Sequence, residues 1–527
     1  MNYTSGILTK KYNIFLRSFF LIFVTYSLFC NQNYNADCIS AYGKPVATFY
    51  NIPLDSFHPL VALIYGLYLG RPVLVFTHYM IEFIARLCGI TQTHGQFVFV
   101  LIAMLLLAYT GTEIYYLFLD ELKLDDDVIV FCCIMLGIIS PAIAEVLSFT
   151  LVEIFLGLIF TVKALKAFLR NHRIACWLWL FLAIATYQSY YAPFLIYVFF
   201  LLYLRNDGVP HKKWLSEAAI AICIAGTASI VLLLSAKISA VLLGVPAKIP
   251  LSSVLGTNII YRLAEVLLRY GLILLTSGGV FPFGFTLACI AFFLPALVIK
   301  QYKHAGWKGV FLLLILGLSA LVVPPAFALM MRSIYIPPRA LIAFYVAVGL
   351  YFLLCYKALF LPQKKEENAS RSAHVAGLMF GLFLYGYTLF SIFSLNTAGS
   401  NVLSANTLER HIAREIQQEI QDYEETSGNT IRRIGVAHYR IPGQQRFDDA
   451  NFRHFWKYNY FMHLLMYTTW SDVASLNYFN NTDYERFDMT SAEKHAFFSD
   501  LDIEKMGTFN PDTQLVFVGD TLYWATY

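Results

Sequence analysis

Residues 96–119 read QFVFVLIAMLLLAYTGTEIYYLFL and carry a single charged side chain, Glu113. A helix needs about 20 apolar residues to cross the roughly 30 Å hydrocarbon core of a bilayer, so this segment predicts a membrane-spanning helix. The whole chain has 527 residues, of which 58% are hydrophobic and 14% are charged, whereas an average soluble domain has about 25% charged residues. The sequence therefore predicts an integral membrane protein.

Segments of the same kind recur over residues 1–395, which we expect to form a polytopic α-helical domain. The other single spans are predicted at residues 12–30, 128–147, 148–169, 215–243, 282–299, 310–330, 341–361 and 374–395. The block 174–204 is long for one helix and short for two, and it has polar residues from Thr186 to Ser189 at its middle. This block predicts two short helices that meet at a polar corner, which brings the total to about eleven transmembrane helices.

Lysine and arginine residues predict the orientation of these helices, because cytoplasmic loops are rich in both. The basic residues near the N-terminus place it in the cytoplasm. Further basic segments follow even numbers of crossings and lie at 163–173, 205–213, 300–308 and 357–371. The outer face then receives the polar corner, loop 31–93 and everything after residue 395. Loop 31–93 is expected to carry two interfacial helices, at 54–69 and 72–90.

The composition becomes that of a soluble protein after residue 395, and residues 396–527 predict a small α/β domain outside the membrane. Residues 407–425 read TLERHIAREIQQEIQDYEE and predict a charged amphipathic helix. Strands are predicted at 431–438, 514–519 and 522–526.

Loop 31–93 holds the first candidate for chemistry, Asp37. It is the only acid between the first apolar segment and Asp55. Tyr34 and Asn35 precede it and offer hydrogen-bonding groups that suit a polyol. Two interpretations stay open: Asp37 is a general base for a hydroxyl group, or it is a hydrated loop carboxylate.

Three arginines are candidates for binding a phosphate, because a planar guanidinium matches the geometry of phosphate oxygens. Arg71 lies between Gly70 and Pro72 in a turn between two apolar stretches. Arg332 and Arg339 bracket an outward-facing turn between two predicted spans. The alternative is that each arginine anchors a helix end among lipid headgroups.

The polar corner carries Tyr187 and Gln188, which either contact the substrate or satisfy backbone groups at the two helix ends. Glu145 and Glu153 are acids inside apolar segments, and such acids are candidates for a functional site. His78 is expected to be structural.

Several function classes are disfavoured by what the sequence lacks. No Walker A loop, GxGxxG, GxSxG or HExxH motif occurs in a fitting context, and the nine cysteines show no CxxC or metal-ligand spacing. The formal net charge of +4 is small and scattered, which argues against nucleic-acid binding.

The order of these features resembles the Gtr glucosyltransferases that modify O-antigen. The resemblance rests on the acid loop after the first helix, the Gly70-Arg71-Pro72 turn, the corner at Tyr187 and Gln188, and the polar α/β tail. It implies a GT-C-like membrane glycosyltransferase that works on the periplasmic side of the bacterial inner membrane. The family usually has adjacent acids in its first loop, whereas Asp37 is followed by Cys38.

The resemblance also implies a reaction. Glucose, or another hexose, would pass from a polyprenyl-phosphate donor to a surface glycan such as the O-antigen of lipopolysaccharide, with inversion and with no metal or other cofactor. A separate flippase and donor synthase would supply the donor. The implied roles are a general base at Asp37, donor-phosphate binding at Arg71, Arg332 and Arg339, and substrate binding at Tyr34, Asn35, Tyr187 and Gln188.

Two other functions fit the sequence less well. A lipid-linked sugar flippase or polysaccharide transporter is expected to show repeated halves and a charged path at the midplane, whereas this chain gathers its polar groups on one face. An O-antigen polymerase typically has its large loop between later helices, whereas the large polar segment here is terminal.

Overall fold

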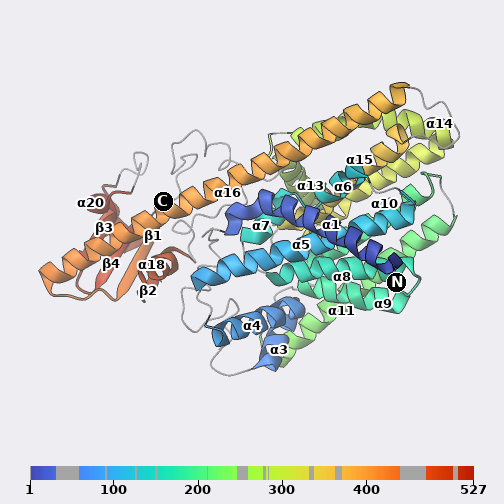
Figure 1. Ribbon diagram of the computed structural model, residues 1–527. Coiled ribbons are helices and arrows are strands. Elements are labelled where there is room, and N and C mark those ends of the chain that lie inside the picture. Colours follow the sequence, from blue (N-terminus) through green and yellow to red (C-terminus); the bar gives the residue numbers. More distant parts are fainter. Residues whose placement is uncertain are drawn as a thin grey trace.

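A computed structural model shows a helical bundle joined to a small sheet domain by one long helix, α16 (Figure 1). The residues described are 2–30, 58–89, 92–124, 127–148, 152–209, 212–245, 259–276, 280–282, 284–330, 338–361, 371–439, 471–501 and 509–526. Of the predicted site residues, Tyr34, Asn35, Asp37 and Arg332 lie outside these ranges.

The bundle consists of helices from α1 to the first half of α16. Their bounds are α1 Asn2–Tyr26, η1 Ser27–Cys30, α3 Pro59–Leu69, α4 Pro72–Leu87, α5 Gln92–Leu122, α6 Val128–Leu136, α7 Pro141–Ser148, α8 Val152–Leu169, α9 Arg173–Thr186, η2 Gln188–Tyr190, α10 Tyr191–Arg205, α11 Lys212–Leu242, α13 Ile259–Thr276, α14 Phe285–Val322, η4 Pro324–Met330, η5 Pro338–Leu341, α15 Ile342–Cys355, η6 Tyr356–Phe360 and α16 Arg371–Ser427.

The predicted membrane character is confirmed. Among the described residues, six helices are long and apolar enough to span a bilayer, or seven if the bent pair α6 and α7 is one span. Helix α14 contains a break at Gly306, where φ is 64°, so the two spans predicted at 282–299 and 310–330 lie on its two halves. The total of about eleven crossings stays a prediction.

The polar corner forms where it was predicted. Helix α9 ends at Thr186, the 3-10 turn η2 follows, and α10 begins at Tyr191. With 14 and 15 residues, α9 and α10 are both short. The corner therefore presents Tyr187 and Gln188 between two helix ends.

Helices α6 and α15 pack very closely, and glycine permits this contact. A Cβ atom added at Gly349 would overlap the backbone carbonyl of Cys133. Gly137, directly after α6, faces the Cα of Val346 in the same way, with a Cβ-to-Cα distance of 3.1 Å. Small residues commonly allow such close approach between membrane helices.

We expect Gly349→Ala to destabilise the bundle by about 1–3 kcal/mol, because the overlap is with backbone and forces the two helices apart. Gly317→Ala is the matched control, because a Cβ there meets nothing within 4 Å. Thermal unfolding in detergent measures both variants. Equal melting temperatures for the two would contradict the close packing described here.

The C-terminal domain is a four-stranded sheet in the order β2-β1-β4-β3. Strands β1 (Arg433–His438), β2 (Glu485–Asp488) and β4 (Thr521–Thr526) are parallel, and β3 (Leu515–Val518) is antiparallel to β4. Short helices complete it: α18 Asp472–Asn480, α19 Ser491–Phe498 and α20 Pro511–Gln514. Strand β2 was not predicted, whereas the other three strands were.

Helix α16 joins the two parts without interruption. The helices predicted at 374–395 and 407–425 are one helix of 57 residues, which is about 85 Å long at 1.5 Å per residue. Its first half packs on the bundle, where the Asn396 side chain donates to the backbone carbonyl of Val24 (3.1 Å). Its second half buries Ile412, Ile416 and Ile420 against the sheet.

Candidate functional site

Five polar residues from four separate elements meet at the end of the bundle that lies nearer the C-terminal domain. They are Arg71, Glu145, Tyr187, Gln188 and Arg339, and we call them the two-arginine cluster. The end of α1 lies beside both α7, which carries Glu145, and the middle of α16, so the cluster is at the end of the bundle where α16 leaves it. The Tyr26 hydroxyl pairs with backbone groups of Ile138 and Ser140, just before α7, and α16 passes α1 at Asn396.

The first arginine owes its position to the local sequence. Gly70 ends α3 in the left-handed conformation (φ 69°), and the N–H of Arg71 returns to the carbonyl of Gly66 (2.8 Å), as is usual for a glycine-capped helix. Pro72 then begins α4, a position where its missing N–H costs nothing. Arg71 is thereby held in a tight turn between two helices.

Gln188 fixes this turn from the other side. The Arg71 Nε donates to Gln188 Oε1 (3.0 Å), and Gln188 Nε2 donates to the Gly70 carbonyl (2.8 Å). The Arg71 guanidinium also lies 5.0 Å from the centre of the Tyr187 ring, within the range of a cation–π contact. One amide and one ring therefore orient the guanidinium.

The second arginine reaches the same tyrosine. The Arg339 Nε donates to the Tyr187 hydroxyl (3.1 Å), and its Nη1 donates to Glu145 Oε1 (2.6 Å). The backbone N–H of Arg339 donates to the other Glu145 oxygen. Glu145 is buried, so its carboxylate holds both the backbone and the side chain of Arg339 in place.

The cluster carries a formal charge of +1, because two guanidiniums face one carboxylate. Within the described part of the chain, Arg71 uses only its Nε for hydrogen bonding, and a guanidinium has five N–H donors. Such an arrangement suits a monoanion with several acceptor oxygens, such as a phosphodiester.

A second buried group ties α4 to the bundle. His78 on α4 lies with Nδ1 2.7 Å from Glu153 on α8 and with Nε2 2.9 Å from Glu82 on its own helix. All three side chains are largely buried. Arg71 precedes α4 by one residue, so this contact helps to fix the turn, and the structural role of His78 stays a prediction.

The structure thus brings together four of the predicted residues, Arg71, Tyr187, Gln188 and Arg339. The pairing of Arg339 with Glu145 was not predicted. The sequence nevertheless indicates such a pair, because Glu145 is an acid inside an apolar segment and a buried carboxylate needs a cationic partner.

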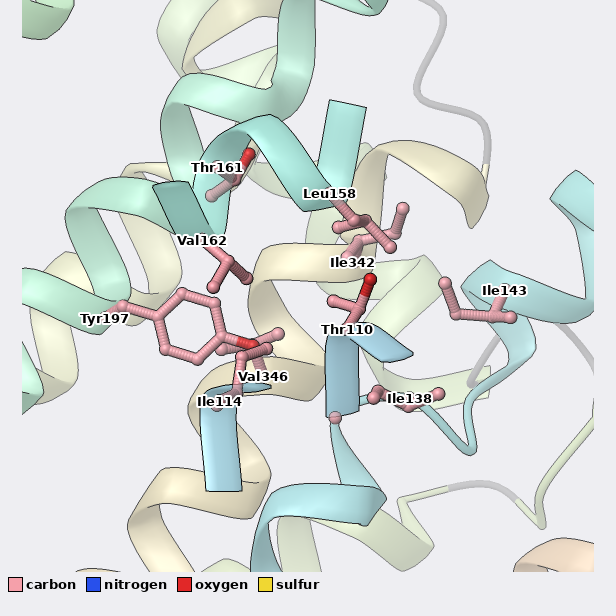
Figure 2. A pocket seen from close by; sticks show the side chains of 11 residues that line it. Thr110, Ile114, Ile138, Ile143, Leu158, Thr161, Val162, Tyr197, Ile342 and Val346 are labelled. Atoms are coloured by element: carbon pink, nitrogen blue, oxygen red, sulfur yellow. The ribbon is translucent and has the colours of Figure 1, made fainter. Parts of the chain in front are cut away.

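A small cavity among the described residues lies elsewhere in the bundle. It is lined by residues of α5, α7, α8, α10 and α15 and of the link that follows α6, and Figure 2 shows side chains around it, among them Ile114, Val162 and Val346. Its volume is about 10 Å³, the size of one water molecule. The hydroxyls of Thr110 and Thr161 are bonded to their own helices. This cavity is a small apolar gap and does not hold a sugar or a lipid.

A comparison with protein families decides the identity. The family model of glucosyl transferase GtrII matches residues 51–356, more than half of the chain. The protein belongs to the GtrII glucosyl transferase family. No curated protein and no solved structure matches the chain significantly.

The match places this GtrII-family protein among the glucosyltransferases. It contains every residue of the two-arginine cluster, and it ends before α16 and the C-terminal domain. The family match therefore carries no information about the role of the C-terminal sheet domain.

Proposed function

We propose that the protein transfers glucose, or another hexose, from a polyprenyl phosphate to a surface glycan such as the O-antigen of lipopolysaccharide. The observation that carries this proposal is the two-arginine cluster: Arg71 and Arg339 converge on Tyr187 with a net formal charge of +1. A polyprenyl-phosphate sugar is a phosphodiester with one negative charge, which this cluster matches.

The reaction is a single displacement at the sugar. An acceptor hydroxyl oxygen forms a bond to the anomeric carbon, and the bond from that carbon to the phosphate oxygen breaks. The hydroxyl proton passes to Asp37 as general base. The bonding electron pair leaves with polyprenyl phosphate. Because the hydroxyl attacks the face opposite the departing phosphate, the configuration of the sugar inverts.

The arginines act on the leaving group. Negative charge grows on the phosphate as the sugar departs, and fixed cationic donors stabilise that charge in the transition state. Glu145 is a positioning residue, because it holds Arg339 through two contacts. Arg332, seven residues before Arg339 in the sequence, is proposed as a further phosphate contact.

The reaction is proposed for the periplasmic face of the bacterial inner membrane, with the N-terminus in the cytoplasm. The cluster lies at the end of the bundle from which α16 leads to the C-terminal domain, so site and domain would share one compartment. Lipid-linked sugar and glycan acceptor both occur there. A separate flippase and donor synthase would supply the donor.

We expect Arg71→Lys to lower transfer about tenfold, mainly through a higher KM for the donor. Lysine keeps the positive charge but loses the planar fork and its stacking on Tyr187. Initial rates over a range of polyprenyl-phosphate glucose concentrations measure this change.

The control for this variant is Arg269→Lys. Arg269 is about half exposed on α13 and is paired with Glu265 (2.8 Å), so its replacement is expected to leave the donor KM unchanged. An unchanged donor KM in Arg71→Lys would argue that Arg71 only anchors its helix end.

The proposed function is tested with membranes that contain the protein, labelled polyprenyl-phosphate glucose and a purified acceptor glycan. Label is expected to appear in the glycan, and analysis of the product linkage is expected to show inversion. A lipid-linked sugar that crosses the membrane without reaching the glycan would instead indicate a flippase.

A further inference from the structure

The carboxyl ends of the parallel strands in the C-terminal domain gather polar side chains. His438 and Asp488 are the last residues of β1 and β2. In open α/β sheets, ligands commonly bind just outside this edge. The edge is separate from the two-arginine cluster and lies beyond the residues matched by the GtrII family.

Four side chains form a connected group here, which we call the carboxyl-edge cluster: His438, Asp472, Arg486 and Asp488. His438 Nε2 lies 2.9 Å from Asp472 Oδ2. Arg486 Nε contacts both Asp472 oxygens, at 2.9 and 3.1 Å, and its Nη2 donates to Asp488 (2.7 Å).

The strand register explains why these residues meet. Ile434 pairs with Arg486 and Val436 pairs with Asp488. Alternate residues of a strand share one face, so His438 projects on the same side. This is the face that packs against α16 and α18, and Asp472 is the first residue of α18.

The cluster is organised from a buried centre toward solvent. The Asp472 side chain is fully buried, whereas 18% of His438, 26% of Arg486 and 75% of Asp488 are exposed. Asp472 therefore orients the imidazole and the guanidinium, whose outer edges reach solvent beside the Asp488 carboxylate. Groups held in this way lose little side-chain entropy when a ligand binds.

The carboxyl edge faces the bundle. Helix α16 runs outward from the bundle and ends at Ser427, and β1 begins only a few residues later, at Arg433. The Tyr423 hydroxyl near the end of α16 contacts the carbonyl of Gly519, just before β4. The strands thus begin at the far end of α16 and run back toward the bundle.

The charge of the cluster narrows the class of ligand. Two carboxylates face one guanidinium, so the formal charge is −1 when His438 is neutral. The hydrogen bond from Arg486 holds the pKa of the Asp488 carboxyl below its ordinary value, so Asp488 stays ionised at neutral pH. The exposed Asp488 carboxylate disfavours a phosphate, whereas the hydroxyl groups of a neutral sugar find both acceptors and donors.

We propose that the carboxyl-edge cluster binds the acceptor glycan and presents it toward the bundle. Asp488 accepts hydrogen bonds from sugar hydroxyls, and the exposed edges of His438 and Arg486 supply further contacts. This inference rests on the proposed function, because it names the place where the acceptor of that reaction is held.

The test uses the full-length protein in lipid nanodiscs and, as probe, the neutral polysaccharide released by mild acid from lipopolysaccharide of the source bacterium. Binding is measured calorimetrically without donor. Asp488→Asn is expected to weaken binding about tenfold, because one hydrogen bond to a charged group is lost. His438→Gln is expected to weaken binding as well. Asp488 is largely exposed, so its replacement leaves the fold intact.

The matched control is Glu485→Gln. Glu485 lies on the same strand at its other end, and its side chain is 72% exposed, so this variant is expected to bind like the wild type. Unchanged binding by Asp488→Asn, absence of binding by the wild type, or competition by inorganic phosphate would each overturn the inference. Wild-type protein that binds the glycan but transfers no glucose from polyprenyl-phosphate glucose would contradict only the proposed function.

Discussion

Replacement of Asp37 by Asn is expected to reduce glucose transfer by a factor of about 10²–10⁴, the usual contribution of a general base. The acceptor is a hydroxyl group, which must lose its proton as it attacks the sugar. Asparagine keeps the size of the side chain but has an NH2 donor in place of one acceptor oxygen, and it does not accept this proton. Transfer from labelled polyprenyl-phosphate glucose in isolated membranes measures the loss.

Asp55→Asn is the control for this variant, because Asp55 is the next acid along the same loop. Both variants are expected to reach the membrane at wild-type levels, which immunoblotting checks. The competing interpretation, a hydrated loop carboxylate, predicts that the two variants behave alike. Normal glycan modification by Asp37→Asn would therefore remove Asp37 from the mechanism.

Arg339→Met is expected to lower transfer by about 10²–10³, the typical effect of removing one fixed donor to developing charge. The same change leaves Glu145 buried without its side-chain cation. Loss of one partner of a buried ion pair typically lowers the free energy of unfolding by about 3–5 kcal/mol. Activity and thermal stability of the purified protein are measured together.

A double variant separates the loss of transfer from the loss of stability. Arg339→Met combined with Glu145→Met removes the buried charge with its partner, and replacing a whole buried pair by apolar residues is often neutral for stability. We expect this protein to regain a melting temperature near that of the wild type and to remain inactive. A double variant that transfers glucose at the wild-type rate would show that Arg339 serves the fold alone.

Local signals in the sequence predicted much of the bundle and part of the site. The polar residues inside 174–204 marked the corner between α9 and α10, and the Gly70-Arg71-Pro72 run marked the turn that presents Arg71. Each of these is encoded within a few residues, because glycine, proline and polar residues interrupt apolar helices locally.

Contacts between distant residues were not predictable in this way. Arg339 and Glu145 are 194 residues apart, and only the packing of η5 against α7 brings them together. Strand β2 has four residues, of which three are charged, and the arginine among them is directed to a buried aspartate. It therefore lacks the apolar alternation by which strands are recognised.

The continuity of α16 was missed for another reason. The change of composition at residue 396 marks where the helix leaves apolar surroundings, and backbone helicity does not depend on that change. Side chains on both sides of the boundary support the helix: Asn396 bonds to the backbone of α1, and Ile412 packs on the sheet.

The central claim is that Arg71 and Arg339 hold the phosphate of a lipid-linked donor. Its most direct test is the affinity of purified protein in nanodiscs for polyprenyl-phosphate glucose, measured without acceptor. We predict that Arg71→Lys and the double variant of Arg339 and Glu145 each bind the donor at least about tenfold more weakly than the wild type, whereas Arg269→Lys binds it equally well. Equal affinity in all four proteins would contradict the claim.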